Sequence, residues 1–286
     1  RLLSYTSTWD CSSMLNLRSF ESLRKENYVY VDKTEMVYEL AERGKYYFLS
    51  RPRRFGKSLL VSTIEAYFSG RKDLFKGLAI DELEKDWECH PILHLDLNTE
   101  RYNTVDSLTD KLEANLNDWE QLYGKNPVAK SFATRFEYVI RYAYEKTGHP
   151  VVILVDEYDK PMLQAIGNEE LQNEYRGILK GFYGALKSQD RYIRFALLTG
   201  VTKFGKVSVF SDLNNLQDLS MDARYQALCG MTEDEVVRYF GEPIRALAIK
   251  NKLSEEETLA RLKKRYDGYH FVENGIGIYN PFSLLN

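Results

Sequence analysis

The triplet Gly56-Lys57-Ser58 combines a flexible backbone position, an ammonium group and a hydroxyl. It follows an apolar, strand-like run at 46–49 and a basic loop at 51–54, and it precedes a predicted helix. Backbone N–H groups and the helix dipole at such a helix N-terminus favour the binding of phosphate. The lysine of this pattern reaches the β- and γ-phosphates of a nucleotide, and the hydroxyl holds Mg²⁺. We therefore expect a nucleoside triphosphate, ATP, and Mg²⁺ at this turn.

The loop departs from the pattern G-x-x-x-x-G-K-[ST] at its first position. Arg51 stands where the first glycine is expected, and Pro52 follows it. Glycine permits backbone turns that a side chain resists, so we expect the exit from the strand to differ from that of a standard phosphate loop. The alternative interpretation is that 51–58 is a solvated turn between a strand and a helix, without a ligand.

A second motif lies about a hundred residues later. The run 151–155 is β-branched and apolar throughout, as in a strand buried on both faces of a parallel sheet, and it ends in Asp156 and Glu157. Asp156 can bind the shell of a Mg²⁺ ion, and Glu157 can orient and deprotonate the water that attacks the γ-phosphate. The alternative is that these two acids and Asp159 only begin a polar loop.

Further strands are predicted at 92–97, 192–200 and 225–229. Thr199 ends the strand at 192–200, and we expect it to sense the γ-phosphate and position the attacking water; capping of the next turn is the alternative. In a parallel sheet, ligands collect at the carboxyl ends of the strands. The polar residues at the strand ends should converge there: Ser50, Asp96, Asp156 and Thr199.

Helices alternate with these strands along the chain. Apolar residues at helical spacing predict one helix that ends at Gly44, with Thr34 as its N-cap. Others are predicted at 58–68, from Leu108 to Trp119, and at 132–146. This alternation predicts an α/β fold with a parallel sheet flanked by helices.

The sequence changes character beyond Gly230. Thr232 and Ser254 each begin a capping box, which predicts helices at about 233–249 and 255–265, with Pro243 interrupting or kinking the first. We interpret 231–286 as a small helical lid with an aromatic docking segment at its end, 16–230 as the catalytic core, and 1–15 as an N-terminal extension.

The composition suits one large α/β domain with an appendage: 286 residues, 44% hydrophobic and 28% charged. A net charge of −3 gives no global attraction for nucleic acid, so polyanion binding would need a local patch such as Arg51, Arg53, Arg54 and Lys57. No apolar stretch approaches the length of a membrane span, and no secretory signal is visible. The cysteines and histidines are dispersed, which predicts a protein without a disulfide framework or a zinc site. Such a protein is expected in the reducing cytoplasm.

Several motifs together resemble the predicted AAA-ATPase-like family. The resemblance covers nearly the whole chain from about Asn16 and rests on these strings: YVDKT at 30–34, YFLSRPRRFGKS at 47–58, VDEYDKP at 155–161, LTGVTKF at 198–204, YDGY at 266–269 and YNPF at 279–282. In that family the absence of the first glycine is the usual pattern. Members typically continue into a PD-(D/E)XK nuclease-like domain, and nuclease activity is not assigned to residues 1–286.

The resemblance implies a P-loop ATPase fold of the additional-strand type, with Mg²⁺ at Ser58 and Asp156 and Glu157 as general base. It implies nucleotide contacts along the loop, from Arg54, Phe55, Gly56, Lys57, Ser58 and Leu59. We add the prediction that Arg53 or Arg54 leans over the γ-phosphate, in the role that an arginine finger has in other ATPases. The alternative is that both face solvent or bind a nucleic-acid backbone.

These observations favour an ATPase, converting ATP and water to ADP and phosphate, that acts as a nucleotide-driven switch, as a homo-oligomer or through a C-terminal effector. A nucleotide-gated module that binds nucleic acid with little turnover is the second interpretation. A small-molecule phosphotransferase is the third, and it is disfavoured because Glu157 is suited to activating water and no acceptor pocket is evident from the sequence.

Overall fold

The computed structural model describes residues 19–203 and 215–285. Its centre is a five-stranded sheet with the order β2-β3-β4-β1-β5. All neighbouring strands of this sheet run parallel. The strands are β1 (Tyr46–Ser50), β2 (Ile92–Asp96), β3 (Val151–Asp156), β4 (Ile193–Gly200) and β5 (Gln217–Asp218). Because β4 lies between β1 and β3, the fold is of the additional-strand type predicted for a P-loop NTPase.

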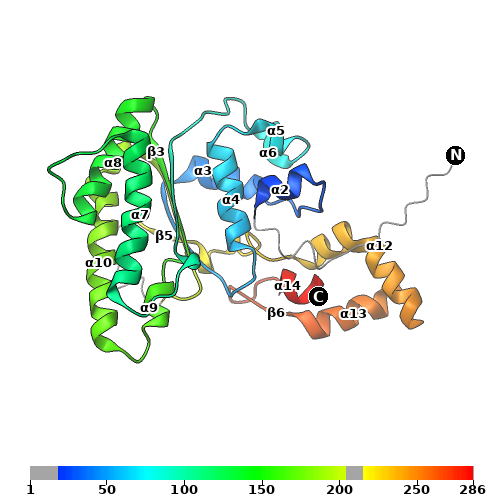
Figure 1. Cartoon of the computed structure of the whole chain (residues 1–286). Helices are drawn as coiled ribbons and strands as arrows, with labels where there is room; N and C mark the ends of the chain where they lie inside the picture. The colour runs from blue at the N-terminus through cyan, green and yellow to red at the C-terminus, as the bar shows by residue number, and fades with distance from the viewer. Residues whose placement is uncertain (1–18, 204–214, 286) are drawn as a thin grey trace.

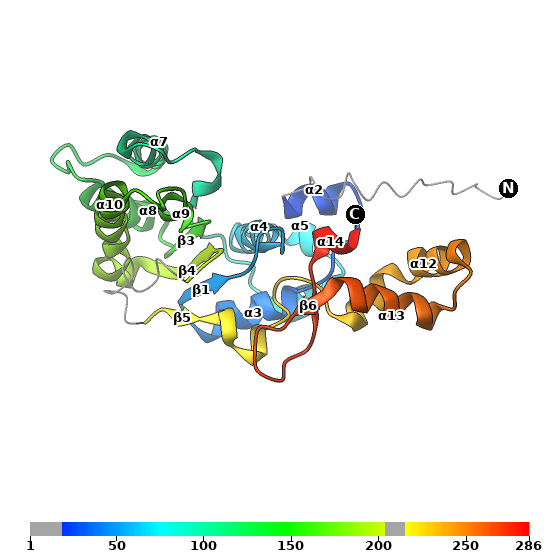
Figure 2. The same ribbon diagram turned by 90° about the horizontal axis from the view of Figure 1, so that it is seen from below.

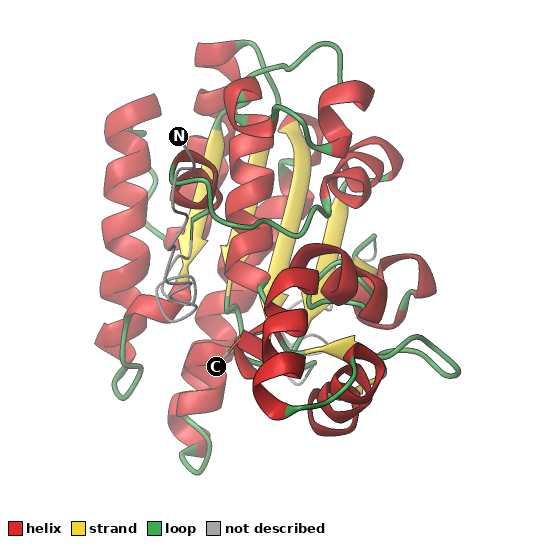
Figure 3. Cartoon of the chain, turned by 90° about the vertical axis from the view of Figure 1, so that its right-hand side faces the viewer, coloured by secondary structure: helices red, strands yellow, loops and turns green. Residues whose placement is uncertain are grey.

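Helices cover both faces of the sheet, as Figures 1 and 3 show. Three long helices lie on one face: α7 (Val105–Tyr123), α8 (Phe132–Thr147) and α10 (Glu169–Ser188). The other face carries α3 (Thr34–Arg43) and α4 (Lys57–Phe68). Each face of the sheet has an apolar core, and alternate residues of β3 belong to one or the other. Val151, Ile153 and Val155 lie in the core under the three long helices, whereas Val152 and Leu154 lie in the core under α3 and α4. This burial on both faces explains the uninterrupted apolar run of β3.

Short helices and turns connect these elements. The short α-helices are α2 (Phe20–Lys25), α5 (Lys72–Phe75), α6 (Ala79–Leu83) and α9 (Lys160–Gln164). The 3₁₀ turns are η1 (Leu97–Thr99), η2 (Asp190–Tyr192), η3 (Leu219–Met221) and η4 (Ala223–Tyr225).

Two local predictions are wrong. The fifth strand is not at 225–229: the N–H of Tyr225 bonds to Asp222 (3.0 Å) and that of Leu228 to Tyr225 (3.1 Å), so this stretch turns on local bonds and β5 precedes it. The second error is the N-cap of α3. Thr34 is the first residue of the helix, and the carboxylate of Asp32 accepts from its N–H at 2.9 Å.

The C-terminal residues form a helical unit at the carboxyl-edge side of the sheet, at the lower right of Figure 1. It consists of α12 (Glu233–Asn251), α13 (Glu255–Tyr266), β6 (Asp267–Tyr269), β7 (Ile278–Tyr279) and α14 (Pro281–Leu285). Both capping boxes are formed. The break in α12 is at Phe240, three residues before Pro243, as expected when a proline ring clashes with the preceding turn.

This C-terminal helical unit has its own apolar cluster, which includes Val236, Phe240 and Ile244 and packs against Val29 and Val31. The unit therefore contacts the segment before α3 as well as the sheet domain, and Figure 2 shows α12 and α13 on the side away from α7, α8 and α10. The division of the chain at residues 15 and 230 stays a prediction. Within residues 19–203 and 215–285, no helix combines the length and apolar character needed to cross a bilayer.

Candidate functional site

The two sequence motifs meet at the carboxyl edge of the sheet. The hydroxyl of Ser58, in the first turn of α4, donates to Oδ2 of Asp156 at the end of β3, at 2.5 Å. The hydroxyl of Thr199 on β4 donates to Oδ1 of the same carboxylate. Asp156 is 3% exposed, and among the described residues it forms no ion pair. A buried carboxylate held by two hydroxyl groups thus joins three elements of the fold.

The four predicted strand ends lie at one edge of the sheet, but not all of their side chains meet. The side chains of Asp156 and Thr199 are joined by a hydrogen bond. The N–H of Ser50 instead donates to the hydroxyl of Ser220 at 2.9 Å, on the far side of β1. Asp96 is next to Asp156 in the β2–β3 register, but its carboxylate accepts from the N–H of Asn98 (2.7 Å) and caps η1.

The side chain of Lys57 folds back onto the loop that precedes it. Its ammonium donates to the carbonyls of Arg51 (3.1 Å) and Pro52 (3.3 Å) and pairs with Oε1 of Glu157 at 3.1 Å. Glu157 has a left-handed backbone (φ 57°), and its N–H donates to the hydroxyl of Thr199 at 3.4 Å. Burial raises the pKa of Glu157, and the charge of Lys57 opposes that shift. The lysine and the predicted general base are therefore direct partners.

Gly56 provides the turn into α4. Its φ of 94° lies in the left-handed region, where a side chain would be strained. Arg54 also has a positive φ, 63°. The two positions turn the loop back on itself, so that α4 begins at Lys57 with its N-terminal N–H groups at the loop.

Arg51, at the position of the missing glycine, is a buried anchor. It is 1% exposed, and its guanidinium donates to the carbonyls of Ser220 (2.9 Å) and Tyr225 (3.3 Å). The same group lies 3.8 Å from the centroid of the Phe271 ring. Burial lowers the pKa of Arg51. The arginine therefore ties the start of the loop to η3, η4 and the C-terminal helical unit.

Phe55 is the second anchor of the loop. Its ring is fully buried and makes edge contacts with Tyr269 (4.9 Å between centroids) and Phe271 (5.4 Å). Its carbonyl accepts from the N–H of Gly230 at 3.0 Å. A Cβ at Gly230 would lie 2.6 Å from the Phe55 ring, so glycine is required there. Phe55 can thus contribute only its backbone to a nucleotide site.

The two remaining arginines of the loop are exposed. The guanidinium of Arg54 stacks over the ring of Phe282, 3.8 Å from its centroid. Arg53 lines the pocket described below, together with Lys57 and Glu157. Of the four cations in the predicted basic patch, Arg51 and Lys57 are buried, so the patch is smaller than the sequence indicates.

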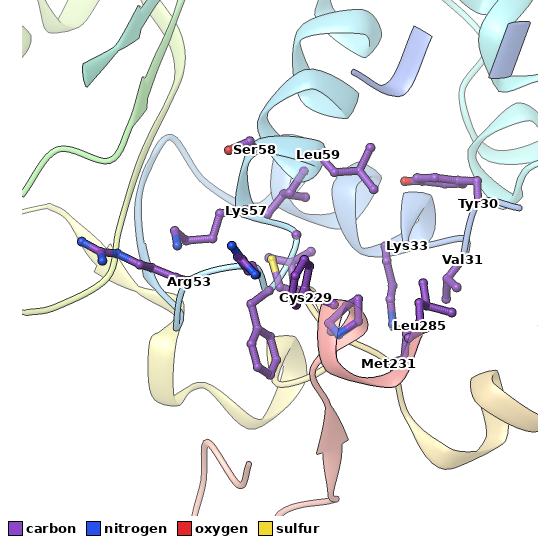
Figure 4. Close-up of a pocket in the computed structure, with 18 of the residues that line it drawn as sticks. Tyr30, Val31, Lys33, Arg53, Lys57, Ser58, Leu59, Cys229, Met231 and Leu285 are labelled. Carbon is purple, nitrogen blue, oxygen red and sulfur yellow. The ribbon is translucent and has the colours of Figure 1, made fainter. Parts of the chain in front are cut away.

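A cavity of about 700 Å³ opens beside the loop (Figure 4). Its polar end carries Arg53, Lys57 and Ser58, and its mainly apolar end carries Val31 and Leu285 beside Lys33. All six residues of the predicted nucleotide-binding stretch line it: Arg54, Phe55, Gly56, Lys57, Ser58 and Leu59. The cavity is therefore enclosed partly by the loop and partly by the C-terminal helical unit.

Lys33 lines this cavity but is already paired. It is 7% exposed, and its ammonium contacts both carboxylate oxygens of Glu235 at 2.5 and 2.6 Å. Burial lowers the pKa of Lys33, and Glu235 opposes that shift. Glu235 is also the capping-box residue of α12, since it accepts from the N–H of Thr232 (2.8 Å). This ion pair joins the segment before α3 to the C-terminal helical unit.

Comparison with known proteins gives the family of the chain. A family model described as "Predicted AAA-ATPase" matches residues 15–210. The chain belongs to this AAA-ATPase-like family. A curated protein of Azotobacter chroococcum mcd 1, described as an uncharacterized protein in the vnfD 5' region, is 40% identical over 273 residues. The alignment covers 95% of this chain and 50% of that protein, so the chain spans about half the length of its relative.

The donor set of this AAA-ATPase-like chain suits Mg²⁺. The ion prefers oxygen ligands and is usually held by one or two carboxylates together with phosphates. Asp156 and Ser58 offer such oxygens side by side, and the carboxylate is buried without a cation near enough to pair with it in the described chain. No cluster of three or more His, Cys, Asp or Glu suited to a metal occurs in residues 19–203 and 215–285.

Sequence reasoning missed a rigid turn after the strand β3. Asp159 is fully buried and accepts from the N–H groups of Val201 (3.1 Å) and Thr202 (2.7 Å). A Cβ at Gly200 would lie 2.5 Å from the Tyr158 ring, so that glycine admits the turn. The acids here do not begin a solvated loop, because the turn is locked to the end of β4. The sequence did carry one signal for this turn, because β3 and β4 both end in polar residues.

Proposed function

We propose that this chain binds ATP with Mg²⁺ and hydrolyses the bond between its β- and γ-phosphates, which gives ADP and phosphate. The observation that carries the proposal is the 2.5 Å hydrogen bond between Ser58 and Asp156, beside the Lys57–Glu157 pair and at the polar end of a cavity of about 700 Å³. A cavity of this size is typical of a small-molecule site. The description of the family as predicted AAA-ATPases supports nucleotide binding in general.

Each residue has a role that follows from its position. The N–H groups of the loop and of the first turn of α4 would bind the β-phosphate, and Lys57 would leave its loop carbonyls to contact the β- and γ-phosphates. Ser58 and Asp156 would hold Mg²⁺, which when bound neutralises charge on the phosphate oxygens. The apolar end of the cavity, with Val31 and Leu285, would receive the base.

Glu157 would act on the attacking water. Its carboxylate now pairs with Lys57, and a phosphate group that competes for that lysine would release it to accept a proton from water. Its backbone is fixed by Thr199 and by the hydrogen bonds of the turn to the end of β4, so the carboxylate keeps its place in the lining of the cavity. Thr199 would help to orient this arrangement.

The site is also coupled to the C-terminal helical unit, which supports a role as a switch. Arg51, Arg54 and Phe55 all contact aromatic residues of that unit, namely Tyr269, Phe271 and Phe282. A change of loop conformation on binding or hydrolysis would therefore be transmitted to the unit through these contacts.

Two substitutions test the proposal. We expect Lys57→Ala to abolish binding of an ATP analogue, because the charge that compensates the phosphates is lost. We expect Glu157→Gln to keep binding and to lower phosphate release by about 100-fold or more. Binding is measured by titration with a fluorescent ATP analogue and turnover by release of phosphate. Full turnover in both variants would overturn the proposal.

Nucleic-acid binding is the alternative function, and exposed Arg53 is the observation that favours it. It predicts that the chain retains DNA or RNA in a salt-sensitive manner and that Arg53→Ala weakens retention. Phosphate release measured with DNA, with RNA and with small hydroxyl acceptors separates a nucleic-acid-stimulated ATPase, a simple ATPase and a phosphotransferase.

A further inference from the structure

Lys160 is a further cation at the polar end of the cavity, and it comes from outside the phosphate loop. It lines the cavity with Glu157 and Asn98 and begins α9, the short helix after β3. Its ammonium donates to the backbone carbonyl of Asn98 and, at 3.1 Å, to the side-chain oxygen of the same residue. Lys160 thus links the segments that follow β2 and β3, beside the cavity.

The backbone that carries Lys160 is held firmly. Its N–H donates to the carbonyl of Glu157 at 3.0 Å, so the two side chains belong to one turn. The hydroxyl of Tyr158 donates to the carbonyl of Thr202 at 2.9 Å, and Asp159 accepts from two N–H groups after β4. A residue placed by this turn keeps a fixed position relative to the predicted general base.

The charge of Lys160 is not neutralised by contact. Both oxygens that it contacts, those of Asn98, are uncharged, and within the described chain Lys160 takes part in no ion pair. Lys57, by comparison, is paired with Glu157. An ammonium group has three donors, and Asn98 uses two of them. Burial lowers the pKa of Lys160, with the acids Asp96 and Glu157 opposing. An ammonium group with a spare donor and no counter-charge in contact is suited to an anionic partner.

We propose that Lys160 is a catalytic residue of the ATPase reaction, whose ammonium contacts the γ-phosphate and stabilises the charge that develops there, with Asn98 as its positioning residue. This inference rests on the proposed ATP hydrolysis. It differs from the expectation for Arg53 and Arg54 in that the cation comes from the turn after β3 and not from the phosphate loop.

The test is Lys160→Met, which removes the charge and keeps most of the side-chain length. We expect kcat to fall on the order of 100-fold, the effect of removing one donor to transition-state charge, while the affinity for ADP changes less than about threefold. Affinity for Mg²⁺-ADP with aluminium fluoride, which mimics the transferring phosphoryl group, should fall as far as kcat does. Lys160→Arg should recover part of both, because it restores the charge.

The matched control is Lys187→Met. Lys187 is exposed on α10, next to Leu186, whose carbonyl accepts from Tyr46 at the start of β1 and thus at the opposite end of the sheet. Lys187→Met makes the same change of charge away from the site, so the kcat of this variant should equal that of the unaltered chain. Asn98→Leu should lower kcat less than Lys160→Met, since it removes one of the two bonds that orient the ammonium.

The outcomes separate this inference from the proposed function. An active unaltered chain with unchanged kcat in Lys160→Met would overturn the role of Lys160 alone. Equal losses of ADP and aluminium fluoride affinity, or no recovery in Lys160→Arg, would also overturn it, because they indicate a structural role. An unaltered chain that binds ATP analogues and releases no phosphate would overturn both proposals.

Discussion

Asp156 illustrates, at the scale of single residues, how burial selects chemistry. A carboxylate that is 3% exposed is costly to bury unless hydrogen-bond donors or positive charge surround it. Here the donors are the hydroxyls of Ser58 and Thr199, two groups that can also stay beside a bound cation. Arg51 is the complementary case, since a buried guanidinium is held by carbonyls and an aromatic ring. Both buried side chains lie beside the phosphate loop.

His94 gives a pH-dependent prediction at the same scale. Its Nδ1 lies 3.0 Å from Oε2 of Glu65; burial opposes protonation, but Glu65, with Asp156 and Asp96 nearby, raises the pKa above 6.5. The protonated form therefore stabilises the fold fully below pH 6.5, and this stabilisation is lost as the pH rises through the folded pKa. Its size should be about 0.5–1 kcal/mol for a partly exposed pair.

The measurement is the free energy of unfolding in urea between pH 5.5 and 8.5, in EDTA. His94→Gln should remove this part of the pH dependence, and Glu65→Gln should remove it too. His149→Gln is the control, since His149 has no carboxylate within ion-pair distance among the described residues. The same slope in His94→Gln and in the unaltered chain would contradict the assignment.

At the scale of elements, the phosphate loop is held by the segment around β6 and β7. Phe271 contacts both anchors, lying against the Arg51 guanidinium (3.8 Å) and the Phe55 ring (5.4 Å between centroids). The loop has no regular structure of its own to hold Arg51 and Phe55 in place. The conformation of the site is therefore decided jointly by two elements that are far apart in the sequence.

Phe271→Ala should consequently weaken nucleotide binding. The lost ring contacts amount to about 1–2 kcal/mol, which corresponds to a rise in Kd of roughly 5- to 30-fold if the loop depends on them. Phe271→Tyr keeps the ring and should bind like the unaltered chain. The control is Phe132→Ala, which truncates a partly buried ring at the start of α8. Equal affinities in Phe271→Ala and Phe132→Ala, by titration with a fluorescent ATP analogue, would contradict this role.

At the scale of the whole molecule, the C-terminal helical unit returns to the N-terminal part of the chain. The pair Lys33–Glu235 joins residues about two hundred positions apart, with side chains 8% and 20% exposed. Val29 and Val31 pack on the apolar cluster of the same unit. The cavity lies between these parts, so its shape depends on how they are held together.

Glu235→Gln should be strongly destabilising. The glutamine can still accept from the N–H of Thr232, but Lys33 is left buried without a counter-charge, at a cost of about 2–4 kcal/mol. The double variant Lys33→Met with Glu235→Gln should recover most of this loss. Glu233→Gln, on the same helix as Glu235, breaks the exposed pair of Glu233 with Lys263 of α13 and should cost less than about 1 kcal/mol. Additive losses in the double-mutant cycle, measured by urea unfolding, would contradict the coupling.

Local patterns in the sequence were sufficient to predict the α/β fold and the meeting of Ser58 with Asp156. The reason is that helix caps, a continuous apolar run and a strand ending in acids depend on neighbouring residues, and parallel strands bring their carboxyl ends to one edge. The tertiary structure alone decided that Arg51 and Phe55 are anchors, that β5 is at 217–218, and that Lys160 reaches Asn98. These depend on contacts between residues 62 to more than 200 positions apart, which no local pattern specifies.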